Sequence, residues 1–444
     1  MGTATRARGS AARSRGRRAG GSESAAAVAA PQPRTPATTV LRTESLTTRI
    51  GPFQLQQLVL IELALAVLAV AAAIHRLLLV PAAVVAVALI LFAVMRRHQR
   101  SLRDWLSTVL ALRARRRLAA QPVTERVDAS LAPAAECVPG LRSYAFLDRD
   151  RRTVGMIGDG SFLTAVVRVE AGVSVLRPAF GARALPLGLL REALEVDGIV
   201  LESAQLVQHV QPAPATHLPE QSVARRSYAP LQEQTGSPAL RLTWVALKLD
   251  PELCQEAVKA RGGGLEGAQR CLVRAADQLA SRITGSGFRA TVLNEEELIS
   301  AVATSACVNP MATARASQPD APPSRRTQET SRAWRCDDRW HTSYAVGRWP
   351  ELGRAATPLP RLVSQLTSVP ALTTTFSLTV GRGTRRQAVS VHGHVRVTGG
   401  SDAELGNARK HVEKAARSAK VGLVRLDREQ LPGTLATLPM GGVR

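Results

Sequence analysis

Two apolar runs near the N-terminus, Leu55–Ile74 and Leu77–Met95, are separated by only His75 and Arg76. Each run has roughly the 20 residues that a helix needs to cross a hydrocarbon core about 30 Å thick. Two spans joined by so short a connection must run antiparallel, so we expect a transmembrane helical hairpin at 51–97. The rest of the chain then lies on the same side of the membrane as the N-terminus.

The positive charge of the chain is concentrated around these runs. Residues 1–120 contain 18 arginines and four acidic residues, which accounts for +14 of the total charge of +23. Positive flanks stay in the cytoplasm, so we expect an inner-membrane protein with two spans and both termini cytoplasmic. Arginines beside a membrane attract anionic lipid headgroups at about 1 kcal/mol each. No aromatic-interleaved basic strand or recognition helix is present, and we expect no nucleic-acid partner.

Five residues around the hairpin are candidates for contact with the membrane or with partner subunits. A carboxylate in an apolar span usually faces a partner or an interface, and the first run contains one acid. The amphipathic segment 101–112 carries a tryptophan that suits the membrane surface, and arginines precede it. These candidate residues are Glu62, Arg96, Arg97, Arg100 and Trp105. Residues 1–50 form a disordered basic arm by composition, and 98–140 hold the amphipathic helix and a linker.

The remainder of the chain shows a repeated order of strand and helix patterns. Residues 162–304 read as strand, short helix, strand, strand, long helix, strand and helix, and residues 341–438 repeat this order. We therefore predict an α+β protein with two tandem β-α-β-β-α-β (ferredoxin-like) halves, at 141–304 and 333–444. The polar, Pro- and Ser-rich stretch 305–332 reads as a flexible linker between them. A single mixed α/β sheet domain built from the same elements is the alternative.

Helix-capping patterns support the duplication. Asn294 and Glu297, Ser401 and Glu404, and Asp427 and Gln430 all have the spacing of a capping box. The first and third of these pairs follow the last predicted strand of their respective halves. Such a coincidence in register favours an internal repeat.

No catalytic motif stands out. The glycine run Gly262–Gly267 lacks the strand–loop–helix setting of a phosphate-binding loop. The five cysteines are widely spaced without a C-x-x-C pair, and we expect free thiols. Asp337 and Asp338, with Cys336 and His341 nearby, could hold a divalent ion for a sugar nucleotide, but one short cluster is a weak metal signal. We expect no cofactor, no metal site and no catalytic residues.

Five stretches resemble one known family. They are Leu58–Glu62, Ser101–Leu106, Leu240–Asp250, Trp334–Asp338 and Val421–Arg428. Over roughly 51–444 the chain resembles the EccE subunits of actinobacterial type VII (ESX) secretion systems. The resemblance implies an inner-membrane complex with EccB-, EccC- and EccD-type subunits and a structural role without established catalytic residues.

Three functions remain open at this point. The first is a non-enzymatic assembly subunit of a type VII protein secretion complex, whose hairpin packs on partner spans and whose cytosolic domain binds neighbouring subunits. The second is a membrane-tethered sugar-nucleotide enzyme with a glycosyltransferase-like domain that uses Asp337 and Asp338. The third, a membrane-anchored nucleic-acid binder, has the least support in the charge pattern.

Overall fold

The computed structural model describes part of the 444 residues, and contacts divide the chain into two units, 1–40 and 41–444. The described residues, all in the second unit, are 49–50, 53–74, 79–94, 96–97, 100–121, 127–149, 151–171, 184–212, 221–223, 226–227, 240–322, 324–350, 358–383 and 388–442. The expected disordered arm at 1–50 therefore lies almost wholly outside them, and so does the connection at 75–78.

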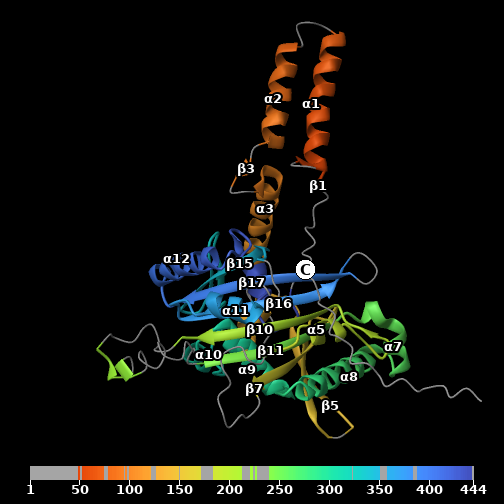
Figure 1. The fold of residues 1–444 in the computed structure, drawn as a ribbon, viewed down its shortest axis with the longest axis vertical. Coiled ribbons are helices and arrows are strands. Elements are labelled where there is room, and N and C mark those ends of the chain that lie inside the picture. Colours follow the sequence, from red (N-terminus) through yellow and green to blue (C-terminus); the bar gives the residue numbers. More distant parts are fainter. Residues whose placement is uncertain are drawn as a thin grey trace, which may run out of the picture. The chain divides into compact units, whose positions relative to one another are not determined.

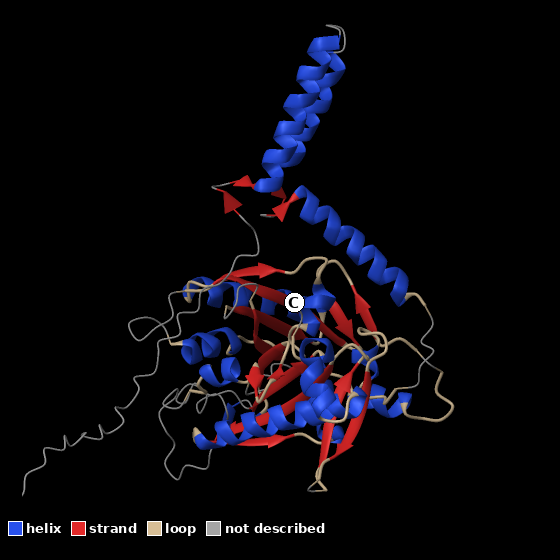
Figure 2. Cartoon of the chain, turned by 90° about the vertical axis from the view of Figure 1, so that its right-hand side faces the viewer, coloured by secondary structure: helices blue, strands red, loops and turns tan. Residues whose placement is uncertain are grey.

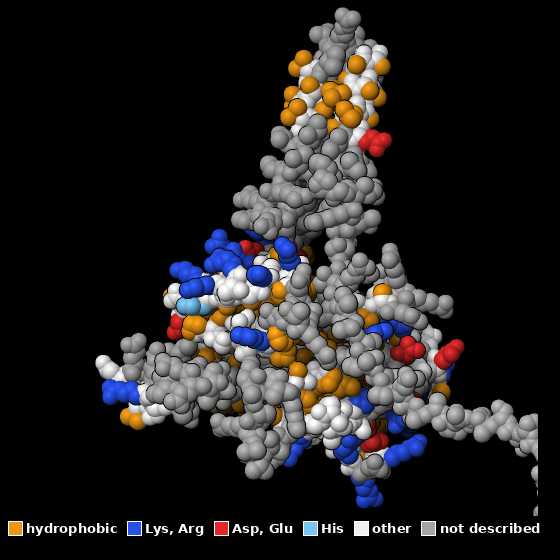
Figure 3. All heavy atoms as spheres, in the orientation of Figure 1, with side chains coloured by type: hydrophobic (Ala, Val, Ile, Leu, Met, Phe, Trp, Pro, Cys, Tyr) orange, Lys and Arg blue, Asp and Glu red, His pale blue; other side chains and the backbone are white. Residues whose placement is uncertain are grey.

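The two apolar runs form helices that pack side by side, α1 (Leu55–Ile74) and α2 (Leu79–Val94) (Figure 1). Small residues fill the contact between them: the buried side chains are Ala64, Ala71, Ala82 and Ala86. Large aliphatic residues point outward and are exposed: Leu65, Val70, Val80, Val84, Val85 and Val87. Figure 3 shows apolar side chains on the visible surface of the helical pair. Within the described residues, no helix combines the length and the apolar character needed to cross a membrane.

A short two-stranded ladder lies between α2 and the next long helix. Two-residue strands β3 (Arg96–Arg97) and β4 (Arg100–Ser101) pair there, as β1 (Arg49–Ile50) and β2 (Phe53–Gln54) do before α1. Helix α3 (Leu102–Ala119) follows, in the place expected for the amphipathic helix. A one-turn helix, α4 (Ala132–Ala135), leads into the first half of the sheet.

The elements of the two halves follow in chain order. The first half contains β5 (Arg142–Leu147), β6 (Thr153–Gly158), β7 (Leu163–Ala171), α5 (Gly188–Glu192), β8 (Glu195–Val196), β9 (Ile199–Val200), β10 (Ser203–Gln211), β11 (Leu240–Leu249), a 3₁₀ turn (Pro251–Cys254), α7 (Gln255–Ala260), α8 (Gly264–Gly285), β12 (Phe288–Val292) and α9 (Glu295–Ala306). The second half contains α10 (Pro310–Ala316), β13 (Thr327–Glu329), β14 (Trp334–Cys336), β15 (Arg339–Arg348), α11 (Leu359–Thr367), β16 (Thr373–Arg382), β17 (Val389–Gly399), α12 (Asp402–Ser418), β18 (Gly422–Arg425) and α13 (Gln430–Leu435).

One antiparallel sheet of 12 strands joins the two halves, so the predicted α+β class is confirmed. In the first half the strand order is β10-β11-β7-β12, and in the second it is β16-β17-β15-β18. In each half this places the second, third, first and fourth strands side by side, as a split β-α-β-β-α-β unit requires. The halves meet where β10 pairs with β16 over Ser203–Val210, so they share one sheet and not two.

Helices cover both faces of this sheet (Figure 2). The first face carries α5, α7 and α8 over the first half, and α11 and α12 over the second. The second face carries α4, α9 and α13 together with the C-terminal segment. Alternation along β11 illustrates the arrangement, because Val245 and Leu247 face the first core while Trp244 and Ala246 face the other.

Two local expectations differ from the structure. The stretch 305–332 contains α10 and β13 in place of a flexible linker, because its polar side chains are engaged with neighbouring elements. The third capping pair is also wrong: Asp427 binds Arg425, and the side chain of Gln430 is buried against Ser343 and Leu426. The other two N-caps are confirmed, with Asn294 and Ser401 each accepting an N–H from the expected glutamate.

Candidate functional site

The five residues predicted to contact the membrane or partners lie in or beside the helical hairpin. Glu62 is in α1 and is exposed. Arg97 and Arg100 are opposite one another in the β3–β4 ladder, next to Arg96, and Trp105 is in α3. The side chains of these last four residues lie outside the described part of the structure. The backbone thus brings the three arginines together at the turn between α2 and α3.

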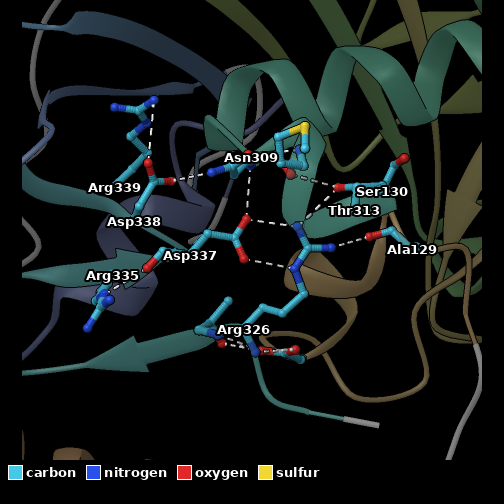
Figure 4. A network of polar contacts seen from close by, with 12 residues as sticks. Ala129, Ser130, Asn309, Thr313, Arg326, Arg335, Asp337, Asp338 and Arg339 are labelled. Atoms are coloured by element: carbon cyan, nitrogen blue, oxygen red, sulfur yellow. Dashed lines mark hydrogen bonds and ion pairs between the residues drawn. The ribbon is translucent and has the colours of Figure 1, made fainter. Parts of the chain in front are cut away.

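Asp337 is held in a polar network and does not offer an open carboxylate (Figure 4). Its two oxygens accept hydrogen bonds from Nε and Nη2 of Arg326 at 2.8 Å each, and one also accepts the N–H of Asn309 at 2.9 Å. Both side chains of the ion pair are only 6% exposed. Asp337 has a left-handed backbone with φ of 51°, and Asp338 binds the Asn309 side chain and Arg339.

The other two members of the proposed metal cluster point away from these carboxylates into the core. Cys336 is fully buried, and burial followed by the charge of Asp337 raises the pKa of its thiol. His341 is also fully buried, with Nδ1 3.0 Å from Oγ1 of Thr398 and its ring against Trp334. Among the described residues, no group of three or more His, Cys, Asp or Glu side chains is placed to hold a metal ion.

The end of α3 is attached to the edge of the sheet by a contact that the sequence did not reveal. Nε and Nη2 of Arg115 donate to the two carboxylate oxygens of Glu329 in β13, at 2.8 and 3.0 Å. Arg115 also donates to the carbonyl of Arg428, and Glu329 accepts the N–H of Leu431. Glu329 is 6% exposed at its side chain, whereas Arg115 is 23% exposed. The α3–β13 junction therefore rests on a shielded ion pair.

Arg325 adds a second attachment at this junction. Its Nη1 donates to the carbonyl of Ala119 at the end of α3, and its Nη2 donates to the carbonyl of Glu136. The carboxylate of Glu136 accepts the backbone N–H groups of Arg326 and Thr327. The segment that leads into β13 is thus fixed to both α3 and the residue after α4.

A cavity of about 500 Å³, here called the arginine pocket, opens beside this segment. Its charged wall consists of Arg315, Arg325, Arg326, Arg335 and Asp337. These residues come from α10, from the segment before β13, and from β14 with the turn that follows it. The pocket was not predicted because Arg315, Arg325 and Arg326 lie in the stretch 305–332, which reads as a flexible linker. The pair Arg325–Arg326 with a third arginine ten residues on was a visible signal.

A second polar cluster is buried on the second face of the sheet. Arg396 is fully buried in β17, where its Nη2 donates to the carbonyl of Ser305, while Nε and Nη1 have no partner among the described residues. His209 lies nearby with Nδ1 2.9 Å from Oγ1 of Thr375. Burial and then the charge of Arg396 lower the pKa of His209 to about 3, so this histidine is neutral.

Comparisons with known proteins single out the middle of the chain. Residues 237–346 match the family described as the type VII ESX secretion system translocon, EccE. This quarter of the chain runs from β11 to β15 and contains Glu329, Arg326 and Asp337. It includes two of the five stretches that suggested the family, Leu240–Asp250 and Trp334–Asp338.

The other comparisons add little. None of the curated proteins matches the chain. Among solved structures, an alkyldihydroxyacetonephosphate synthase is similar at 7% identity with a TM-score of 0.25, covering 61% of this chain and 42% of that one, which is too weak to support an argument. The resemblance to the EccE family of type VII secretion proteins is therefore confirmed, over residues 237–346 of this chain.

Proposed function

We propose that the chain is a non-enzymatic structural subunit of an inner-membrane type VII protein secretion complex. Its α1–α2 hairpin packs on the spans of partner subunits, and its cytosolic domain binds neighbouring subunits of the EccB, EccC and EccD types. The observation that carries the proposal is the match of residues 237–346 to the EccE family.

The distribution of side chains in the hairpin supports the membrane part of the proposal. Alanines such as Ala64 and Ala86 are buried between the helices, while larger residues such as Val80 and Val84 are 73% and 67% exposed. In water this arrangement would leave the most apolar surface solvated. In a bilayer, small residues at the contact let helices approach closely, and large aliphatic residues face lipid or other spans.

The arginines around the hairpin support its orientation. Arg96, Arg97 and Arg100 follow α2 at once and favour the cytoplasmic side, where anionic headgroups lie. Both termini are then cytoplasmic, and α3 connects the membrane surface to the domain. The α3–β13 junction supports a structural role, because the ion pair between Arg115 and Glu329 fixes helix α3 to the domain.

The state of the candidate catalytic carboxylates disfavours the enzymatic alternative. A divalent ion needs carboxylate oxygens that are free to bind it. The oxygens of Asp337 accept three hydrogen bonds, and Asp338 is occupied by Asn309 and Arg339. The metal-dependent sugar-nucleotide site predicted as the alternative function thus loses the residues on which it was based.

Affinity purification tests the proposal. The tagged full-length chain is extracted from native membranes in mild detergent, and co-purifying proteins are identified by mass spectrometry. We expect EccB-, EccC- and EccD-type subunits to be recovered in stable ratios. A chain that purifies without any of these subunits from cells that express them would contradict the proposal.

A matched pair of variants tests the role of the hairpin. Ala86→Leu places a large side chain in the α1–α2 contact, where Ala86 is 1% exposed, whereas Ala83→Leu adds the same group on the exposed side of α2. We expect Ala86→Leu to reduce recovery of the multi-span partner through a distorted hairpin. Equal recovery with both variants would argue against a role of hairpin geometry in assembly.

A further inference from the structure

The charges around the arginine pocket do not balance. Arg326 is neutralised by Asp337, and Arg325 has its Nε 3.9 Å from the carboxylate of Glu136. The remaining two arginines have no acidic partner among the described residues. The side chain of Arg315 makes no hydrogen bond or ion pair there, and that of Arg335 makes one hydrogen bond, in which its Nε donates to the carbonyl of Asp337. The pocket therefore has an excess of two positive charges.

The arginines have donors free for a ligand. Arg315 donates no side-chain hydrogen bond within the described part of the chain, and Arg335 uses only its Nε. The guanidinium of Arg335 stacks on the ring of Trp340 at 5.4 Å, which holds it in place and leaves its terminal nitrogens available. A planar, preorganised guanidinium binds phosphate or carboxylate groups through two parallel hydrogen bonds.

The size of the pocket and its uncharged wall indicate a ligand larger than a bare ion. Cavities of roughly 300–1,000 Å³ are typical of small-molecule sites, and this one measures about 500 Å³. Its uncharged wall includes Ala312, Ala316, Ala321 and Pro322. An apolar wall beside a cluster of arginines suits a molecule with an anionic group at one end and an organic group at the other.

We propose that the arginine pocket binds a small phosphorylated molecule, with its phosphoryl group held by Arg315 and Arg335. A phosphoryl dianion matches the excess of two charges, whereas a single carboxylate would leave one charge uncompensated. This site is independent of the role in secretion proposed above, because it rests only on the charges and shape of this pocket.

Calorimetric titration of the full-length chain in mild detergent tests the proposal, with ADP and inorganic phosphate as probes. We expect saturable binding of ADP with a dissociation constant below about 1 mM. The double variant Arg315→Ala/Arg335→Ala should weaken it at least tenfold. The control Lys410→Ala/Arg417→Ala removes the same charge from exposed positions of α12 and should bind ADP like the unmodified chain.

Phospholipid headgroups offer the same phosphoryl chemistry, so a parallel titration uses mixed micelles that contain phosphatidylglycerol. Binding of ADP or phosphate that depends on Arg315 and Arg335 identifies a soluble ligand. Binding of phosphatidylglycerol alone, if it also depends on Arg315 and Arg335, identifies a lipid headgroup as the ligand. The proposal is overturned if no probe binds up to about 10 mM, or if the pocket variant and the control bind equally.

Discussion

Arg115 in α3 and Glu329 in β13 are 214 residues apart in the sequence, yet they form a two-point ion pair at 2.8 and 3.0 Å. Glu329 is the central acceptor of this junction, because it also accepts the N–H of Leu431. One carboxylate thus connects the helix after the hairpin, the edge strand of the sheet and the start of α13.

Neutralising this carboxylate should loosen α3. Glu329→Gln keeps the shape of the side chain but removes the charge, and hydrogen bonds to charged groups contribute about 1.5–3 kcal/mol each. We expect the free energy of unfolding to fall by about 2 kcal/mol and trypsin to cleave the segment after α3 faster. Arg113→Ala, at an exposed position of the same helix, serves as the control. Indistinguishable cleavage of the two variants would show that the ion pair does not hold the helix.

Asp337→Asn should be much more damaging than Asp338→Asn. Asparagine tolerates the left-handed backbone at Asp337, so the change acts mainly through the charge of Arg326, which is left buried without compensation. Removing one partner of a buried ion pair costs about 3–5 kcal/mol, whereas exposed surface changes stay near 0.5 kcal/mol. Chemical denaturation of both variants measures the difference. Similar losses for the two would mean that Asp337 is not the stabilising member of the network.

The buried histidines predict a loss of stability in acid. The pKa of His209 is about 3 in the folded chain and 6.5 in the unfolded one, so below pH 6.5 the unfolded state binds the extra proton. Stability should therefore fall as the pH drops from about 6.5 towards 3, by about 2 kcal/mol at pH 5 from His209 alone. His341 has a pKa shifted in the same direction by burial and the charge of Arg396, and adds to the effect.

A variant separates the histidine contribution from that of the acids. His209→Gln should flatten the dependence of the unfolding free energy on pH between 6.5 and 4.5, whatever its effect on stability at pH 7.5. The measurement is chemical denaturation at a series of pH values. An unchanged slope would exclude His209 as a source of the acid sensitivity.

Gln205 should be essential for the C-terminal segment. Its side chain is fully buried at the β10–β16 contact, donates to Ser377 and to the carbonyl of Ala436, and accepts the N–H of Gly441. Gln205→Met leaves two buried backbone groups without partners, at about 1–3 kcal/mol each. Gln208→Met, on the opposite side of the same strand, should cost about 0.5 kcal/mol or less. The readout is the midpoint of thermal unfolding, and equal midpoints for the two variants would refute this role.

Periodicity and caps in the sequence predicted the elements of the repeat closely. The order strand, short helix, strand, strand, long helix, strand and helix predicted for 162–304 was found as β7, α5, β10, β11, α8, β12 and α9, with short elements between them. Helix α8 was predictable because one of its faces is apolar and the other polar, whereas β11 is buried on both faces and was recognised as a run of strand-forming residues. The α3–β13 junction could not be predicted in this way, since it depends on Arg115 and Glu329, which are 214 residues apart. The charged residues of the arginine pocket lie within 315–337, but the pocket depends on how α10 folds against β14, which periodicity does not show.

The pairing of β10 with β16, which joins the two halves into one sheet, also could not be predicted from local patterns in the sequence. Strand β16 (Thr373–Arg382) carries threonine and serine at the positions that face Gln205 and His209, and such residues in isolation suggest an exposed face. They are buried because β10 pairs with β16 and supplies polar side chains that hydrogen-bond to them, as Gln205 does to Ser377 and His209 to Thr375. Only the pairing partner, which periodicity does not identify, explains their composition.

The short edge strand β13 has a mechanical consequence. It is paired with β14 through only three residues, Thr327–Glu329, whereas β10 and β16 are paired over eight. A tension applied to α3 enters the domain at Glu329 and at the adjacent Arg325. We therefore expect pulling on the anchor to peel off this edge first, leaving the central sheet intact.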